Sequence, residues 1–96
     1  MFRGNFQAYQ PATTQKVDYT GTSAATSNAV ATGIHLVRVV STTDCHVAIG
    51  GTPTATTSDL YLPAYTVEYF IVNEGQKLAA IRAASSGSLY VTEMTK

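Results

Sequence analysis

The stretch GIHLVRVVSTTDCHVAIG, residues 33–50, holds two strand signals on either side of a turn signal. The first signal is the strongest apolar run in the chain. In the second, Cys45, Val47 and Ile49 alternate with polar or small residues. A period of two places alternate side chains on opposite faces of a strand, and the STTD between the two segments is rich in turn-forming residues. This stretch therefore predicts two short β-strands and no helix.

The same pattern extends outward in both directions. Further strand-like segments occur at 15–20, 22–31, 59–64, 66–72, 76–83 and 87–95. Gly, Pro, Asn and Ser separate these segments, and NEG and SSG are typical of hairpin loops with glycine in the left-handed conformation. No long segment has a helical period. We expect an all-β fold, a small antiparallel β-sandwich (jelly-roll-like or barrel) of about six to eight short strands.

The chain has 96 residues, which is the size of one domain. We expect residues 15–96 to form the sandwich and residues 1–14 to form an extended N-terminal arm. The arm carries Phe2, Phe6 and Tyr9, and aromatic rings of this kind usually cover another surface. These three residues are therefore candidates for an interface.

Charge is sparse and balanced. Only 12% of residues are charged, and the formal net charge is zero. Such a chain lacks the basic patch that nucleic-acid binding requires, and it has no apolar run long enough to span a membrane. The N-terminus has no signal-peptide pattern, so we expect a soluble protein made in the cytoplasm. Low charge and small size favour association with other subunits, which covers much of the surface.

Residues used in catalysis cluster only at Asp44-Cys45-His46. A thiol–imidazole dyad needs both groups within hydrogen-bonding distance, but consecutive strand residues point to opposite faces. We expect Cys45 to be a small buried residue and His46 to face solvent. If segments 34–40 and 45–50 form a hairpin, His35 lies near His46, although two histidines alone are weak evidence for zinc.

Other reactive patterns are missing. The six carboxylates have no spacing that pairs them across a cleft, and the serines lack a nucleophile-elbow motif. Gly50-Gly51 is not followed by the Lys and Ser/Thr of a phosphate-binding loop. The sequence therefore predicts no enzyme, and no catalytic, cofactor-binding or metal-binding residues.

The Thr-rich segment 50–58 separates two predicted strands. Its glycines can supply positive φ angles, Pro53 stiffens it, and Ser58 and Asp59 can form hydrogen bonds with their own backbone. Its length exceeds that of a minimal hairpin, so we expect a loop that crosses between sheets or projects from one end. Pro53 is a further interface candidate.

Aromatic residues gather in the second half of the chain, at Tyr61, Tyr65, Tyr69, Phe70 and Tyr90. An aromatic strand face can stack on sugars or bases, but more often it forms a core or a subunit interface. Tyr65 follows Pro63-Ala64 in a predicted turn, where its ring is exposed. We therefore take Tyr61 and Tyr65 as interface candidates.

The order of these motifs also resembles a known group of proteins. The resembling stretch runs from about Val37 to Met94 and comprises V-R-V-V, C-H-V-A-I-G, the Thr-rich loop, S-D-L-Y-L-P-A, V-E-Y-F, G-Q-K-L-A-A-I-R-A and L-Y-V-T-E-M. It is similar to small virion proteins of tailed bacteriophages that are encoded close to the major capsid protein. The resemblance implies a head-decoration or capsid-cementing β-sandwich, often trimeric, with no catalytic residues.

Two functions follow as expectations. The first is a virion protein on the capsid exterior that binds the major capsid protein and its own copies, and so stabilises the shell as a homo-oligomer, with a trimer expected. In this role the arm reaches a neighbouring subunit or the shell. The second is a neck, tail or spike component that binds a receptor or carbohydrate, with Tyr61, Tyr65 or Tyr90 as stacking surfaces.

Overall fold

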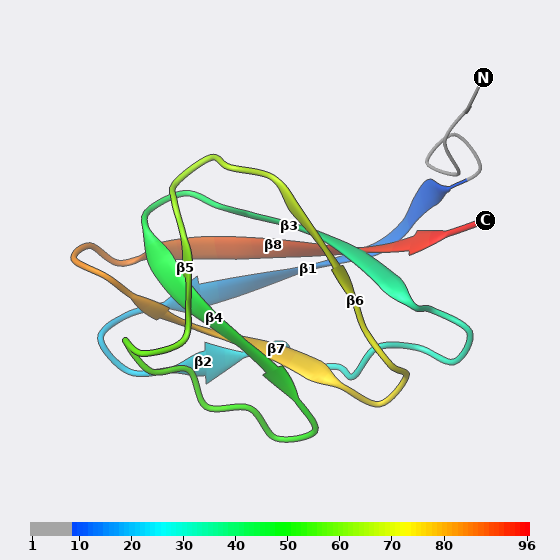
Figure 1. The fold of residues 1–96 in the computed structure, drawn as a ribbon, viewed down its shortest axis with the longest axis horizontal. Helices are drawn as coiled ribbons and strands as arrows, with labels where there is room; N and C mark the ends of the chain where they lie inside the picture. Colours follow the sequence, from blue (N-terminus) through cyan, green and yellow to red (C-terminus); the bar gives the residue numbers. More distant parts are fainter. Residues whose placement is uncertain (1–8) are drawn as a thin grey trace.

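The computed structural model describes residues 9–96. These residues form eight strands, and none of them is helical (Figure 1). The strands are β1 (Gln10–Tyr19), β2 (Ala24–Ala25), β3 (Leu36–Ser41), β4 (Cys45–Gly50), β5 (Leu60–Leu62), β6 (Glu68–Ile71), β7 (Lys77–Arg82) and β8 (Gly87–Thr95). Each strand lies within a segment that the sequence pattern predicts, except that β1 begins before residue 15. The all-β prediction is confirmed.

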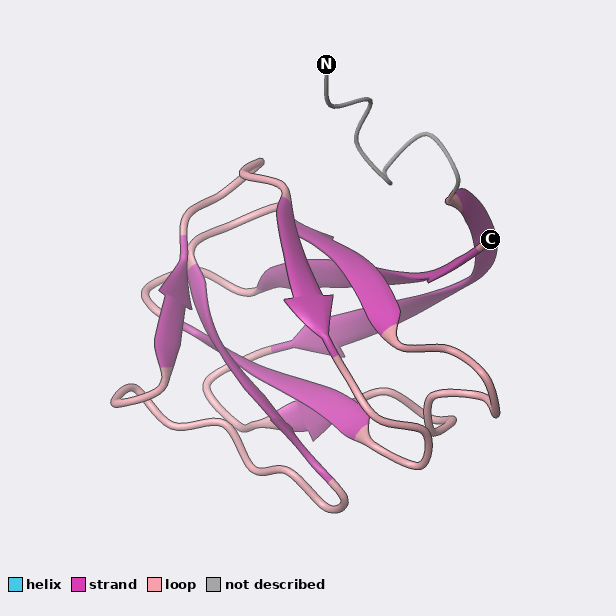
Figure 2. Ribbon diagram, turned by 45° about the vertical axis from the view of Figure 1, so that its right-hand side comes forward, coloured by secondary structure: helices cyan, strands magenta, loops and turns pink. Residues whose placement is uncertain are grey.

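The strands form two four-stranded antiparallel sheets (Figure 2). Sheet A has the order β1-β8-β3-β6, and sheet B has the order β2-β7-β4-β5. Strands far apart in sequence are neighbours in both sheets, and this is the strand order of a jelly roll. The predicted sandwich is therefore confirmed, in its jelly-roll form.

Most chain-consecutive strands lie in different sheets, which corrects the predicted hairpins. β3 belongs to sheet A and β4 to sheet B, so residues 34–50 do not form a hairpin. His46 lies in β4 of sheet B, whereas His35 immediately precedes β3 of sheet A. The turns 73–75 and 85–87 likewise pass from one sheet to the other. Each sheet has one apolar face, and the two sheets bury these faces by packing against each other. Because the sheets are in contact, a short turn is long enough to pass from one to the other.

Two of these turns use glycine in different ways. Gly75 has the predicted positive φ, at 87°. Gly87 does not have a positive φ. A Cβ at this position would collide with the hydroxyls of Thr42, Thr43 and Tyr19. Gly87 is therefore required by close packing at the start of β8 and not by its backbone angle.

The core lies between the two sheets. Its residues come from both layers and from the β2–β3 connection: Val17, Tyr19, Val30, Ile34, Val37, Val39, Cys45, Val47, Leu62, Val72, Leu78, Ala80, Leu89 and Val91. Tyr19 is 1% exposed and satisfies its hydroxyl by donating to the Thr43 carbonyl oxygen at 2.9 Å. Alternation along each strand explains this set, since every second side chain faces inward.

The segment from Gly51 to Asp59 joins β4 to β5 within sheet B, so the expected crossing between sheets is wrong. Instead it reaches the opposite edge of the same sheet, where the Ala55 N–H donates to the Ser23 hydroxyl at 2.8 Å (Figure 1). Ala48 and Ala79 are register partners on the outer face, and Ala79 is fully buried. We infer that these small side chains let the loop lie close to the sheet.

The glycines of this loop do not have the expected positive φ angles. Asp59 does bond its own backbone as expected, because its carboxylate accepts the Thr56 N–H at 2.7 Å. This bond closes the loop immediately before β5.

The boundary expected between the arm and the sandwich falls inside a strand. Residues 10–14 belong to β1 and pair with the end of β8, as in Gln10↔Thr95. Their side chains are exposed, so this paired ribbon carries both ends of the described chain away from the core (Figure 1). The other predicted arm residues, 1–8, lie outside the described residues.

Candidate functional site

The most exposed apolar row in the described chain lies on and beside β6, the edge strand of sheet A. Val67, Tyr69 and Ile71 are 39%, 45% and 80% exposed. Because side chains alternate, the intervening Phe70 and the following Val72 face the core instead. We call Val67, Tyr69 and Ile71 the β6 stripe.

The β6 stripe continues across the outer face of sheet A. Ile71 pairs with Leu36, which pairs in turn with Met94 of β8. Leu36 is only 9% exposed and is not a member of the core cluster, so its neighbours on the outer face cover it. This row joins the exposed edge to the middle of the sheet.

A parallel row crosses the same face four residues further along β3, at the level of Lys16. Tyr90 of β8 is opposite Val40 of β3 and is 37% exposed. Arg38 is paired with Tyr69 between the two rows. The part of the outer face of sheet A that β3 and β6 form is thus largely apolar, with the guanidinium of Arg38 among its apolar side chains.

The far side of this face carries opposite charges. Lys16 and Asp18 lie 3.7 Å apart, and both side chains are mostly exposed, so their attraction contributes little to stability. The pKa of Asp18 is lowered, first because the Ser88 hydroxyl donates to its carboxylate at 2.6 Å and second because Lys16 is near. These groups mark the polar border of the apolar face.

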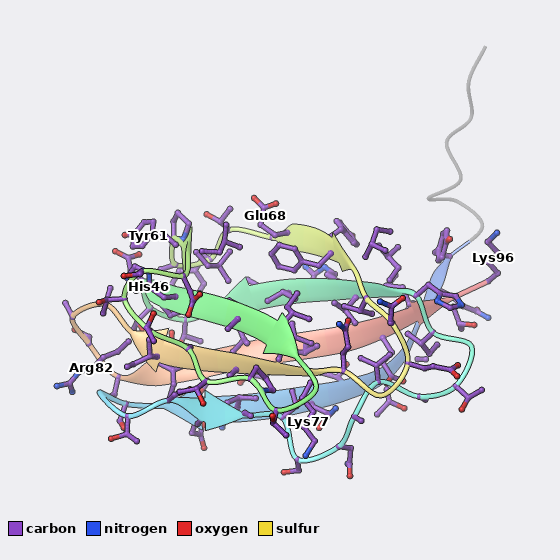
Figure 3. All side chains as sticks on the ribbon, turned by 60° about the horizontal axis from the view of Figure 1, so that its bottom comes forward. His46, Tyr61, Glu68, Lys77, Arg82 and Lys96 are labelled. Atoms are coloured by element: carbon purple, nitrogen blue, oxygen red, sulfur yellow. The ribbon has the colours of Figure 1, made fainter. Side chains whose placement is uncertain are left out.

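A second group of side chains lies around Tyr61 on sheet B. We call Asp44, His46 and Tyr61 the Tyr61 cluster. The rings of His46 and Tyr61 are 5.5 Å apart and inclined at 58°, and they lie together in Figure 3. His46 Nδ1 is 3.1 Å from the Asp59 carbonyl oxygen, so the nitrogen is the donor.

Asp44 holds this cluster together. Its carboxylate accepts hydrogen bonds from the Tyr61 side chain and, at 2.8 Å, from the Ala64 N–H. Both bonds favour the ionised form and lower the pKa of Asp44, and the same carboxylate raises the pKa of Tyr61. Asp44 therefore fixes the turn after β5 to the start of β4.

Tyr65 occupies that turn in a conformation that is uncommon for its type. Its φ is 59°, its side chain is 75% exposed, and its N–H donates to the Ser41 carbonyl oxygen at 2.8 Å. A left-handed conformation costs an ordinary residue about 1–2 kcal/mol. Glycine would avoid this cost, so the ring is kept at some expense in stability.

The predicted separation of Cys45 and His46 is confirmed. Cys45 is fully buried in the core, where desolvation raises the pKa of its thiol, while half-buried His46 lies on the opposite face of β4. The two groups do not form a dyad. Among residues 9–96 no three His, Cys, Asp or Glu side chains gather as metal ligands would.

The other interface candidates lie in several places. Phe2 and Phe6 lie outside the described residues. Tyr9 is at the start of the described chain, with Lys96 Nζ 5.6 Å from its ring centre, and it lines a shallow hollow of about 270 Å³ together with Gly33, His35, Met94, Thr95 and Lys96. Pro53 is partly exposed in the loop over sheet B.

The expected aromatic platform is divided by the fold. Tyr61 belongs to sheet B, whereas Tyr69 and Tyr90 lie on the outer face of sheet A and Phe70 faces the core. Sequence reasoning did not single out Val67 and Ile71. The signal that could have identified them is that segment 66–72 has apolar residues on both faces. An edge strand whose outer face contacts only water has no need of apolar residues on that face.

No helix formed by residues 9–96 is long and apolar enough to cross a bilayer. Comparisons with protein-family models, curated proteins and solved structures found no match to this chain.

Proposed function

We propose that this chain is a structural protein of a tailed-bacteriophage virion, which decorates and stabilises the capsid exterior as a homo-oligomer, most simply a trimer. It is made in the host cytoplasm and binds the major capsid protein and its own copies. The observation that carries this proposal is the apolar part of the outer face of sheet A that β3 and β6 form, with Ile71 80% exposed at its edge. Contiguous apolar patches on soluble proteins commonly mark contacts with other proteins.

The distribution of surfaces suits a protein that links neighbours. The outer face of sheet A and the Tyr61 cluster belong to opposite layers of the sandwich. One layer can therefore contact another copy of this chain while the other layer contacts the shell. Cementing of this kind requires shape, burial and hydrogen bonds, and it requires no reactive group.

The sequence resemblance supports the same proposal, since the group it points to consists of head-decoration β-sandwiches. The jelly roll itself is a fold that also occurs in lectins and cupins, so it does not choose among these functions. The choice depends on the exposed apolar face.

The test is co-sedimentation of the purified chain with expanded capsids of the phage that encodes it. We expect saturable binding and a higher temperature of capsid disruption when the chain is bound, because ligands stabilise the state that they bind. Tyr61→Ala, in the layer assigned to the shell, should weaken binding, whereas Lys77→Ala, at the opposite end of sheet B, serves as the matched control. Absence of binding to any capsid form would overturn the proposal.

A second candidate function is recognition of a receptor glycan. The Tyr61 cluster favours it, because exposed rings beside a hydrogen-bonding carboxylate can stack on and orient a sugar. Binding to a glycan array that Tyr61→Ala abolishes, with Tyr90→Ala unaffected, would favour this function. No binding by the unmodified chain would remove it.

A further inference from the structure

We propose that the Tyr65 ring of one copy of this chain inserts into the hollow beside Tyr9, His35 and Met94 of the next copy. This inference rests on the proposed function, because it names the contact through which copies associate. It joins two features that the fold of one chain does not explain. One is an exposed ring in a strained turn, and the other is a hollow at the far end of β3.

The turn presents the Tyr65 ring in a fixed position. The side chain is 75% exposed, so it adds little to the packing of its own chain. The turn is held by two hydrogen bonds, from the Tyr65 N–H to the Ser41 carbonyl oxygen and from the Ala64 N–H to the Asp44 carboxylate, each at 2.8 Å. A contact residue on a rigid turn loses little freedom on binding, and tyrosines are frequent among the residues that dominate interfaces.

The hollow has the size and the lining that one tyrosine requires. Its volume of about 270 Å³ is just below that of pockets that hold drug-sized ligands, so it suits a single large side chain. Met94 and the Tyr9 ring supply apolar surface, and both thioethers and aromatic rings make favourable contacts with a tyrosine ring. Lys96, which also lines the hollow, supplies a donor for the tyrosine hydroxyl.

Charge is complementary across the same contact. The Asp44 carboxylate lies exposed beside the Tyr65 turn, where it accepts the Ala64 N–H. Lys96 is exposed at the hollow, and the part of the chain that the structure describes contributes no Asp or Glu to the lining. Opposite charges on two surfaces bring them together in one orientation.

Distance decides that the ring and the hollow belong to different copies. The Tyr65 N–H is bonded to Ser41, the last residue of β3, whereas His35 immediately precedes the first. These two positions on β3 are about 20 Å apart in an extended strand, which a tyrosine side chain cannot span. Figure 3 likewise shows Tyr61, on the strand before the turn, and Lys96 at opposite ends of the molecule.

A contact between opposite ends is head-to-tail, so each copy offers one ring and one hollow. Such a contact repeats from copy to copy and closes into a ring of subunits when the rotation between copies allows it. The trimer of the proposed function is a closed ring of this kind.

The hollow also continues the apolar row on the outer face of sheet A. Met94 pairs with Leu36, and Leu36 pairs with Ile71 at the edge. One tyrosine buries about 150–250 Å², whereas a stable interface buries about 800 Å² per partner. The ring therefore anchors the contact, and this row supplies further area beside it.

Sedimentation equilibrium of the full-length chain tests the role of the ring. Tyr65→Gly removes the ring and relieves the positive φ, so the folded monomer should be no less stable in thermal unfolding. The concentration for half-association should nevertheless rise at least about 30-fold. Tyr65→Phe keeps the ring and should associate like the unmodified chain. Tyr61→Ala is the matched control, because it removes an exposed tyrosine from β5 and should leave association unchanged.

Mixing two variants tests whether the ring and the hollow meet. His35→Trp fills the hollow, so this variant and Tyr65→Gly should each be monomeric at concentrations where the unmodified chain associates. An equal mixture should form a dimer of twice the chain mass, because one variant keeps the ring and the other keeps the hollow. Thr95→Arg, from the same lining, takes the place of His35→Trp if circular dichroism shows that the latter does not fold.

The inference is overturned if the unmodified chain stays monomeric, if Tyr65→Gly associates normally, or if the folded variants form no mixed dimer. These outcomes are separable from those of the proposed function. Association that depends on Tyr65, without capsid binding, would support this inference and contradict the virion role. Capsid binding by a chain whose association is indifferent to Tyr65→Gly would do the reverse.

Discussion

At the scale of single residues, Asp44 links protonation to the fold. Its ionised carboxylate accepts two hydrogen bonds, and its pKa in the folded chain is therefore below the ordinary value of 3.8. A carboxyl group with a lowered folded pKa binds protons more readily when the chain is unfolded. Its stabilising contribution is complete above the unfolded pKa and is lost as the pH falls through the folded pKa.

We therefore predict that the free energy of unfolding decreases below about pH 4 and that Asp44→Asn reduces this pH dependence. Urea unfolding between pH 5 and pH 2 measures the effect. Asp18, whose pKa is lowered in the same direction, leaves a residual slope in the variant. Glu68→Gln, at the exposed edge of sheet A, is the control. An identical slope in wild type and Asp44→Asn would contradict this account of the turn.

Tyr65 gives a second prediction at this scale. Its φ of 59° suits glycine, so Tyr65→Gly should be more stable than Tyr65→Ala by about 1 kcal/mol, although both remove the same exposed ring. Thermal unfolding of the two variants gives the comparison. If alanine is the more stable replacement, the turn does not retain its left-handed conformation in solution.

At the scale of elements, the sequence predicts where the strands lie but not which sheet each joins. Local alternation identifies β3, β4, β7 and β8 because their inward residues are apolar and their breaks carry turn residues. Sheet membership depends on contacts between residues far apart in the chain. Turn chemistry at 73–75 is the same whether the chain reverses within a layer or changes layer.

The sequence likewise predicts some of the residues of the candidate surfaces and not others. An exposed Tyr65 follows from its place after Pro63-Ala64, and buried Cys45 follows from alternation. The outward direction of Val67 and Ile71 does not follow, because both faces of segment 66–72 are apolar. Only the pairing of Val37 with Phe70 decides which face is covered.

The entry into β8 provides a prediction for an element. Gly87→Ala places a methyl group against three hydroxyls, and overpacking of this kind should cost about 1–3 kcal/mol. Gly51→Ala is the matched control, because nothing lies within 4 Å of the added carbon and φ is not positive. Chemical denaturation should show that only Gly87→Ala is destabilised. Equal effects would mean that β8 begins elsewhere.

At the scale of the whole molecule, both the fold and the composition leave apolar side chains exposed on the surface. A domain of 96 residues buries a limited core, and this one leaves Ile71, Tyr69, Val67 and Tyr90 exposed on one layer. The association that we propose would cover that layer and would add to stability in a concentration-dependent way. The central claim is that the outer face of sheet A is buried between copies of the chain.

Sedimentation equilibrium of the full-length chain over the micromolar range tests this claim most directly. We predict a closed oligomer, with a mass three times that of the chain, that Ile71→Lys dissociates and Leu60→Lys leaves intact, since Leu60 is also well exposed but lies on sheet B. A monomer at all concentrations, or an oligomer indifferent to Ile71→Lys, would contradict it.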